Sequence, residues 1–459
     1  MISMDNVKFK MKKNFLSSVW QFYIFNFAFL IFISCSIQKK ISKSAQLVLK
    51  DSALSTAHVG ISIYEAATNK YWFSYQADHY FTPASNTKIP TCYAAMKYLG
   101  DSLEGVLQME NDTAIIILPT GDPTLLHPDF KNQPVISFLQ KATKKIYTTD
   151  YLWQEEPLGA GWSWDDYNDS YMAERSPMPV YGNLIKWTQE SSGVDPSVVY
   201  SVPEVNWQVD FDTAQSNNFF VQRSVAENHY KITEGKEELK EQEVPFVTNG
   251  LKSTLELLTD TVHKTVGLVT SERYQRQFLG KPMQLTPIYS QPKDSVLKPM
   301  MHRSDNFFAE QLLLMVALKF NIAMSDERIS DTLLKTDFKD LPQKPKWADG
   351  SGLSRYNLFS PKDFIFILNK MKNDFGMERI KNIFPTGNEG TLANYYIPER
   401  GYIFAKTGSL SGVITLSGFL YTKKDKLLIF SVLVNNHTSS GTKVRRAVEK
   451  FIEALRNNY

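Results

Sequence analysis

Alternation of apolar and polar positions predicts β-strands near both ends of the chain. Residues 58–65 and 71–75 alternate on either side of a polar turn, the pattern of a β-hairpin. Three more runs of this kind lie near the C-terminus, at residues 402–407, 413–421 and 427–434, with the charged stretch 423–426 as a hairpin tip. We therefore expect an antiparallel sheet built from strands of both chain ends.

Other segments show the longer period of helices. A helix is predicted from Ser85 to about Gly100, and helical periodicity begins again at residue 251 and continues through 306 to 320. Two more helices are expected at 361–371 and at the C-terminus, where apolar side chains fall on one face (Val444, Val448, Phe451, Ile452 and Leu455). The predicted fold is α+β, an antiparallel sheet flanked by helices, with the Ser85 helix beneath it.

Residues 103–250 do not continue this pattern. They contain short β-rich runs, a tryptophan-rich segment at 159–166 and a charged run at 234–243, which is expected to be an exposed loop or hairpin tip. We expect an inserted, mostly β region that forms either one subdomain or two nested subdomains. Trp162 and Trp164 are interpreted as packing anchors rather than ligand contacts.

Composition adds limits to this picture. The chain has 459 residues, which is too long for a single ordinary hydrophobic core. Its content of 43% hydrophobic residues is that of a folded globular protein. Its formal charge of +3 comes from lysines in residues 1–35, and the remainder has a net charge of zero. Nothing in this balance indicates a nucleic-acid surface.

The N-terminus reads as a secretion signal. Residues 14–34 carry no charge, follow Lys12 and Lys13, and end in a small residue directly before Cys35. Residues 1–35 are therefore predicted to be a signal peptide with a lipoprotein-type cysteine at its end. An uncleaved membrane anchor is the alternative, because 21 residues are enough to span a bilayer.

Cysteine and histidine offer no metal site. Cys35 and Cys92 are the two cysteines, and the seven histidines are scattered without ligand spacing. Cys92 is expected to be a buried structural thiol. Neither a metal nor an organic cofactor is expected.

Ser85 and Lys88 are the first candidates for chemistry. They are three residues apart at the start of a predicted helix, so both lie on one face. The partly positive helix terminus disfavours a charged lysine, and a neutral amine can accept the serine proton. The spacing alone is a weak signal, because it recurs at Ser36/Lys39, Ser290/Lys293, Ser295/Lys298 and Ser440/Lys443.

Two further motifs strengthen the interpretation of Ser85 and Lys88 as catalytic residues. Ser304-Asp305-Asn306 stands just ahead of a strongly apolar helix, and Lys406-Thr407-Gly408 ends a predicted strand. With Gly121-Asp-Pro123, residues 161–166 and residues 349–355, these motifs resemble the class C low-molecular-mass penicillin-binding proteins, which are D-Ala-D-Ala carboxypeptidases and endopeptidases. The resemblance covers roughly residues 55–455.

The resemblance implies a domain arrangement. Ser85 and Ser304 are 219 residues apart, and this family has a large insertion between the corresponding motifs. Residues 36–102 and 251–459 are expected to form a discontinuous catalytic domain of the penicillin-binding and β-lactamase type. Residues 103–250 are expected to be the inserted region.

The resemblance also implies roles. Ser85 is the expected nucleophile, Lys88 its base, and Ser304 a relay of the proton to the leaving amine. Asn306 is expected to hold the substrate amide and the Lys88 amine, while Lys406 holds the terminal carboxylate of the substrate electrostatically.

Neighbouring residues complete the expected site. Thr407 is expected to assist in carboxylate binding, and Gly408 allows close approach of the strand to the substrate. The N–H groups of Ser85 and Ser409 are expected to form an oxyanion hole. Asp122 is either a turn residue or a neighbour of the substrate side chain, and Arg355 either a surface charge or part of the pocket.

The expected function is that of a serine-type D-Ala-D-Ala carboxypeptidase, with endopeptidase activity left open. Peptidoglycan stem peptides are the expected substrates, β-lactams the expected covalent inhibitors, and the periplasm or cell envelope the expected location. A membrane contact is expected only through the N-terminal lipid or anchor, and the oligomeric state stays open. Two alternatives are a serine β-lactamase, which is disfavoured because no Glu-x-x-Leu-Asn segment follows Asn306, and a catalytically idle lipoprotein that binds peptidoglycan or senses β-lactams.

Overall fold

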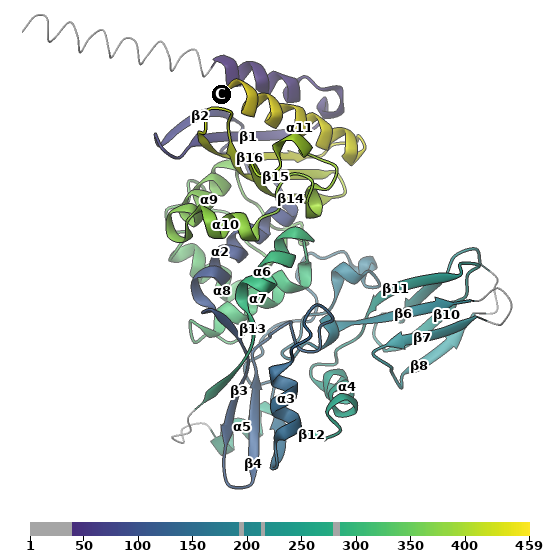
Figure 1. The fold of residues 1–459 in the computed structure, drawn as a ribbon. Coiled ribbons are helices and arrows are strands. Elements are labelled where there is room, and N and C mark those ends of the chain that lie inside the picture. The colour runs from purple at the N-terminus through teal and green to yellow at the C-terminus, as the bar shows by residue number, and fades with distance from the viewer. Residues whose placement is uncertain (1–38, 192–196, 213–215, 279–284) are drawn as a thin grey trace, which may run out of the picture.

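A computed structural model describes residues 39–191, 197–212, 216–278 and 285–459 (Figure 1). The predicted signal peptide and Cys35 lie outside the described residues. Among the helices of the described part, none is long and apolar enough to cross a membrane.

The two ends of the chain build one antiparallel sheet. Its strands lie in the order β14-β15-β16-β1-β2, so that N-terminal β1 pairs with C-terminal β16 and Ile61 stands opposite Val432. The predicted sheet is therefore confirmed. Its strands are β1 (His58–Glu65), β2 (Lys70–Tyr75), β14 (Ile403–Leu410), β15 (Val413–Tyr421) and β16 (Leu427–Asn435).

Helices cover both faces of this sheet, and both faces are buried. On β16, Phe430 packs with α11 (Gly441–Asn458) and the helix at residues 39–49, while its neighbour Ile429 points to the opposite core. That opposite core contains α2 (Lys88–Tyr98) and α9 (Pro361–Phe375) (Figure 1). Burial on both faces explains why the central strands read as nearly continuous apolar runs.

The Ser85 helix begins differently from the prediction. Residues Ala84–Thr87 form a 3-10 turn, and the α-helix starts at Lys88. Pro90 falls in the first turn of α2, where its missing N–H has no intrahelical partner to lose. Ser85 is thus placed at the entry of a helix that is buried over nearly its whole length. Cys92 in this helix is a buried free thiol, as expected.

Four more helices surround α2 in the same layer. The helix α7 starts at Asn306 because Asp305 caps it, accepting the Phe308 N–H at 3.0 Å. The bounds of these helices are α6 (Lys293–His302), α7 (Asn306–Leu318), α8 (Asp326–Lys335) and α10 (Met377–Ile383).

The region between the first two motifs contains three further sheets. One mixed five-stranded sheet packs on α3, and two three-stranded sheets form the arm that projects from the main body in Figure 1. The strands and helices are β3 (Ser102–Glu110), β4 (Ala114–Pro119), α3 (Pro134–Lys141), β5 (Lys145–Thr148), β6 (Leu184–Glu190), β7 (Val198–Val202), β8 (Gln208–Phe211), β9 (Phe220–Arg223), β10 (His229–Thr233), β11 (Leu239–Pro245), α4 (Lys252–Val262), β12 (Val266–Leu268), α5 (Ser271–Phe278) and β13 (Thr286–Pro292).

The five-stranded sheet bears on the expected boundary after residue 250. Its order is β12-β5-β4-β3-β13, so two strands that follow residue 250 pair with strands that precede it. We therefore propose that the inserted region ends near Pro292, and we use "insertion" below for residues 102–292. The helical periodicity expected from 251 to 320 is likewise interrupted by β12 and β13.

The charged run at 234–243 follows its prediction in part, because residues 234–238 form the connection between β10 and β11. Residues from Leu239 onward form β11, which pairs with β6 and places Glu241 opposite Thr188. The charged side chains Lys240, Glu241 and Glu243 of this strand are all exposed, so its sequence resembles that of a loop.

Candidate active site

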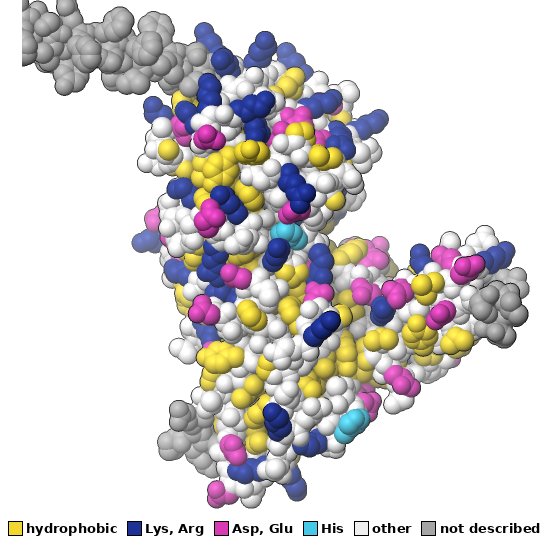
Figure 2. All heavy atoms as spheres, in the orientation of Figure 1, with side chains coloured by type: hydrophobic (Ala, Val, Ile, Leu, Met, Phe, Trp, Pro, Cys, Tyr) yellow, Lys and Arg dark blue, Asp and Glu magenta, His cyan; other side chains and the backbone are white. Residues whose placement is uncertain are grey.

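The three motifs converge at one cleft of about 840 Å³. Ser85 comes from the 3-10 turn that leads into α2, Ser304 from just before α7, Asn306 from the first residue of α7, and Thr407 and Ser409 from β14. The strand β14 is the edge of the main sheet, so its outer side is free to face the cleft. On the face of the molecule drawn in Figure 2, basic and acidic side chains are interspersed.

Lys88 lies at the centre of the predicted machinery. Its Nζ is 3.1 Å from Ser85 Oγ, and it donates to Asn306 Oδ1 at 2.6 Å and to the Ser351 carbonyl at 2.8 Å. A neutral amine has two N–H groups and one lone pair. With the two N–H groups held by Asn306 and Ser351, the lone pair is directed towards Ser85.

Burial gives Lys88 the character of a base. The side chain is fully buried, and desolvation lowers its pKa to about 8, although the carboxylates of Asp349, Glu310 and Asp305 act in the opposite direction. Burial, rather than the helix terminus considered above, is the main cause of this lowered pKa.

A loop at residues 347–357 forms the wall behind Lys88. Asp349 holds it together, because its carboxylate accepts the N–H groups of Gly352 (2.8 Å) and Ser354 (2.6 Å) and the Asn357 side-chain amide (2.7 Å). Asp349 also accepts the Trp162 Nε1–H at 2.9 Å, which ties the loop to the insertion. The tight turn places the Ser351 carbonyl at the Lys88 amine.

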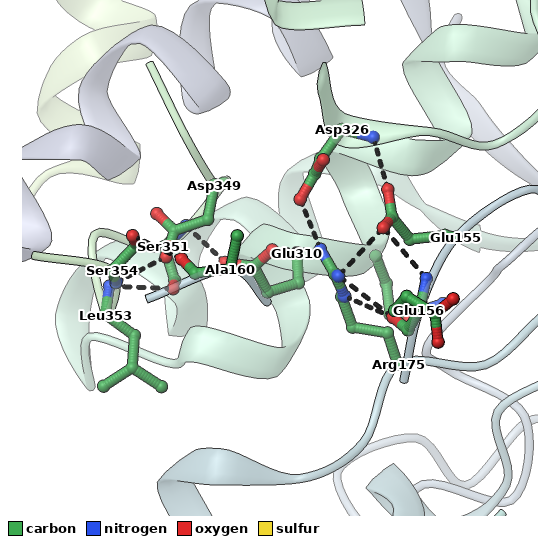
Figure 3. Close-up of polar contacts among 12 residues, drawn as sticks. Glu155, Glu156, Ala160, Arg175, Glu310, Asp326, Asp349, Ser351, Leu353 and Ser354 are labelled. Atoms are coloured by element: carbon green, nitrogen blue, oxygen red, sulfur yellow. Dashed lines mark hydrogen bonds and ion pairs between the residues drawn. The ribbon is translucent and has the colours of Figure 1, made fainter. Parts of the chain in front are cut away.

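Glu310 fixes the same loop from α7 (Figure 3). Its Oε1 accepts the Ser351 N–H at 2.7 Å, and its Oε2 lies 3.4 Å from Arg175 Nη1. Arg175, in the insertion, also meets Asp326 at 2.5 Å and Glu155 at 3.1 Å, and its side chain is almost fully buried. Burial and the nearby Asp349 raise the pKa of Glu310 to about 8, while Arg175 acts to lower it.

Two glycines allow the motifs to meet. A Cβ on Gly408 would lie 2.9 Å from the Ser85 nitrogen, and one on Gly352 would lie 1.9 Å from the Ala84 carbonyl oxygen. Gly352 also has a φ of +85°, which favours glycine. Side chains at these positions would push β14 and the 347–357 loop away from the nucleophile.

Ser304 and Lys406 form a second pair. Lys406 Nζ donates to Ser304 Oγ and to the Thr407 carbonyl, both at 2.9 Å. Lys406 is fully buried and does not line the cleft, and burial together with Lys88 lowers its pKa well below the usual value for lysine. Ser304 has a left-handed backbone (φ +64°), a conformation that is uncommon outside glycine and is often found at functional sites.

Hydroxyl groups and one arginine gather at the end of the cleft beside β14. Thr407 Oγ1 donates to Thr391 Oγ1 at 2.7 Å, and Arg445 Nη2 donates to Ser409 Oγ at 2.9 Å. All four residues line the cleft. Thr391 and Arg445 were not predicted.

Arg355 and Asp122, the two candidates with alternative interpretations, differ in whether they reach the cleft. Arg355 lines the cleft and donates to the Ser411 carbonyl at 3.2 Å. Asp122 is buried and is not among the cleft residues; its carboxylate accepts the Thr124 N–H and hydroxyl, both at 3.0 Å. The turn interpretation of Asp122 therefore fits the structure, and the substrate-contact interpretation does not.

Trp162 and Trp164 differ in how far they are packed against other residues. Trp162 packs under the Arg175 guanidinium, as expected of an anchor, but Trp164 is 74% exposed, and the packing role predicted for it is wrong. The insertion also supplies Tyr171, whose backbone carbonyl accepts a hydrogen bond from the Asn306 side-chain amide at 3.0 Å.

Some contributors had a sequence signal that was overlooked. Glu310 is the one charged residue in the apolar run Phe307–Ala317, and a lone charge at such a position usually has a buried partner. Arg445 offers no comparable signal, because it lies among other basic residues of an amphipathic helix.

The family model for the D-Ala-D-Ala carboxypeptidase 3 (S13) family, Peptidase_S13, matches residues 41–458. The chain belongs to this family. The predicted family is thus confirmed, and with it the class of serine peptidases. The family match spans the insertion and the parts of the chain on both sides of it.

Relatives of this S13 chain extend over most of its length. It is 23% identical over 444 residues to a D-alanyl-D-alanine carboxypeptidase, DacB, of Haemophilus influenzae, covering 88% of this chain and 90% of that one. A D-alanyl-D-alanine carboxypeptidase of Actinomadura sp. strain R39 is 24% identical over 443 residues, covering 85% and 80%. The crystal structure of penicillin binding protein 4 from H. influenzae has a TM-score of 0.70 at 20% identity, covering 90% and 98%. The predicted penicillin-binding fold is therefore confirmed.

Proposed function

We propose that this S13 peptidase is a D-Ala-D-Ala carboxypeptidase that acts on peptidoglycan stem peptides through an acyl-enzyme on Ser85. The observation that carries the proposal is the contact of Ser85 Oγ with Lys88 Nζ, whose other N–H groups are engaged by Asn306 and Ser351. A hydroxyl beside a buried amine of lowered pKa is an activated nucleophile, because the amine can accept its proton.

In the proposed acylation, Ser85 Oγ attacks the carbonyl carbon of the scissile bond while its proton passes to Lys88. The oxyanion is held by the N–H groups of Ser85 and Ser409. The tetrahedral intermediate then collapses: the C–N bond breaks, and the leaving nitrogen takes the proton that Lys88 had accepted, relayed through the Ser304 hydroxyl, so that Lys88 is neutral again. Water hydrolyses the ester and restores Ser85.

Lys406 is assigned to the proton path in this scheme. Its Nζ contacts Ser304 Oγ at 2.9 Å, so it orients the hydroxyl and stabilises negative charge on it. Asn306 holds Lys88, and Thr407 and Ser409 offer hydroxyls to the carboxylate of the leaving residue.

An endopeptidase activity on cross-linked peptides is a second candidate. A further hollow of about 600 Å³ adjoins the cleft and shares Tyr171, Ser304 and Asn306 with it. This gives room for a leaving group larger than one amino acid. The chain is proposed to work in the cell envelope, lipid-anchored at Cys35, with β-lactams as covalent inhibitors.

Labelling and product analysis test these proposals together. A fluorescent penicillin should label the protein at Ser85, and Ser85→Ala should abolish labelling, whereas Ser290→Ala and Ser440→Ala should not. Purified muropeptides should then lose terminal D-Ala, and cross-linked ones should be cleaved if the second candidate holds. Labelling without any product would identify the idle lipoprotein, and labelling that survives Ser85→Ala would refute the nucleophile.

A further inference from the structure

We propose that Arg445 binds the carboxylate carried by the leaving amino acid of the substrate, and that it makes the enzyme prefer this acid over uncharged analogues. The inference rests on the proposed function, because it assumes that a peptide is cleaved in the cleft. It assigns the charge recognition that the sequence placed on Lys406 to a residue from the C-terminal helix.

The position of Arg445 is the first argument. It is half-buried, lines the cleft, and donates to Ser409 Oγ at 2.9 Å. Thr407 and Thr391 line the cleft beside it, so a guanidinium and three hydroxyls share one end of the cleft. A guanidinium offers paired N–H donors that match a carboxylate, and hydroxyls add further donors.

The second argument is that Arg445 has no carboxylate of its own. Within the described part of the chain, no Asp or Glu lies within 4.0 Å of its guanidinium, whereas the adjacent Arg446 is paired with Glu449. Arg445 also lies near the N-terminal end of α11, where the helix dipole disfavours a cation and the first turn has no acidic residue. Neither an ion pair nor the helix accounts for a cation at this place, so an anionic ligand is the simplest partner.

The third argument concerns the alternative cations. Lys406 is fully buried and does not line the cleft. Its Nζ already donates hydrogen bonds to Ser304 and to the Thr407 carbonyl. Arg355 reaches the cleft near Ser411, beyond the end of β14, and its hydrogen bond within the described part of the chain goes to the Ser411 carbonyl rather than to Thr407 or Ser409. Arg445 is therefore the cation that hydrogen-bonds to Ser409, one of the two hydroxyl residues proposed to hold the carboxylate, and it shares the cleft with the other, Thr407.

The test compares one peptide as its C-terminal acid and as its C-terminal amide. The acylation efficiency of Ser85 with each peptide is measured for the wild type, Arg445→Gln, Arg445→Lys and Lys443→Gln. Lys443 is the matched control, since it is an exposed cation on the same helix and is not part of the cleft.

Arg445→Gln should slow acylation by the acid about 10- to 100-fold, the range for losing a hydrogen bond to a charged group, and leave the amide within about twofold. The loss should appear in substrate binding rather than in the rate at saturation, because the carboxylate keeps its charge throughout acylation. Arg445→Lys should fall between the wild type and Arg445→Gln, and Lys443→Gln should match the wild type.

Two results would overturn the inference. If Arg445→Gln slows acid and amide equally, Arg445 merely positions Ser409; if it slows neither, Arg445 does not meet the substrate. Should Arg445→Gln fail to fold, the acid-to-amide ratio of Arg445→Lys decides, and an unchanged ratio counts against the inference. Equal slowing of acid and amide in Arg445→Gln overturns the inference alone, whereas a wild type that penicillin labels but neither peptide acylates, or one that penicillin fails to label at Ser85, overturns the proposed function with it.

Discussion

Glu310 accepts the backbone N–H of Ser351 at 2.7 Å, and the carbonyl of the same Ser351 accepts a hydrogen bond from Lys88. The carboxyl group of Glu310 in α7 is therefore connected to Lys88, the proposed base, through one residue of the 347–357 loop. The arrangement links the helix that carries Asn306 with the helix that carries Ser85, so the three partners of Lys88 are held by one connected set of contacts.

Replacing Glu310 should reveal this link. Glu310→Gln retains an oxygen that accepts the Ser351 N–H, whereas Glu310→Leu leaves that buried N–H without a partner. We expect Glu310→Leu to lose about 1–3 kcal/mol of unfolding free energy relative to Glu310→Gln, and to acylate more slowly. Denaturant unfolding and penicillin acylation of both variants measure this. Equal behaviour of the two variants would show that the hydrogen bond has no such role.

The pH dependence of acylation follows from the state of Lys88. Because burial lowers its pKa to about 8, the amine is protonated below that pH and cannot accept the Ser85 proton. Acylation by a β-lactam should therefore rise with pH and level off above about pH 8. Stopped-flow acylation over this range checks it. A rate that is independent of pH across the transition would argue against a neutral Lys88 as base.

Lys88→Arg separates charge from basicity. A guanidinium keeps the positive charge but does not deprotonate in proteins, so the general base is lost. Acylation by every substrate should fall by about 10²–10⁴-fold, for acids and amides alike. Thermal unfolding serves as the control, since a variant that is both folded and normally acylated would remove Lys88 from the mechanism.

Lys406 and Ser304 should behave as one unit. Since Lys406 contacts Ser304 Oγ, Ser304→Ala removes this hydroxyl and Lys406→Ala removes the donor that orients it. The double variant should therefore acylate hardly more slowly than the worse single variant, and both acid and amide should be affected. Full additivity in this double-mutant cycle, or a loss in Lys406→Ala restricted to acids, would instead favour direct carboxylate binding by Lys406.

The N-terminus offers a prediction that is independent of the site. If Cys35 is the lipidated residue, the mature chain should begin there and carry an acyl modification. Mass spectrometry of protein isolated from membranes of the native host measures it. An unmodified Cys35, or a chain that retains residues 14–34, would contradict the lipoprotein proposal.

The main sheet could be predicted from sequence because each strand carries its own pattern. Strands such as Val413–Tyr421 are apolar and bounded by turn residues, so local reading is enough. The strand β13 was missed because Thr286–Pro292 is polar, begins and ends beside prolines, and pairs with residues far upstream. This segment is a strand because it pairs with β3, and no pattern within residues 286–292 indicates that pairing.

The same contrast holds for the site. Ser85, Lys88 and Lys406 stand in motifs whose spacing is visible in one dimension, and the structure brings them together. The Ser351 carbonyl is a backbone group in a loop, and Arg445 comes from a helix that follows the last motif. Their contributions exist only once the loop and α11 have packed against the cleft.

The buried Arg175 makes the main domain dependent on a segment that looks removable. Arg175 belongs to the insertion, yet it is the cation that faces Glu310 and Asp326 inside the main domain. A shortened chain without residues 102–292 would keep both carboxyl groups in that interior and lose their counter-charge, at a cost that buried ion pairs make severe. A minimal version of this enzyme would therefore have to replace Glu310 and Asp326 with neutral residues before the insertion could be removed.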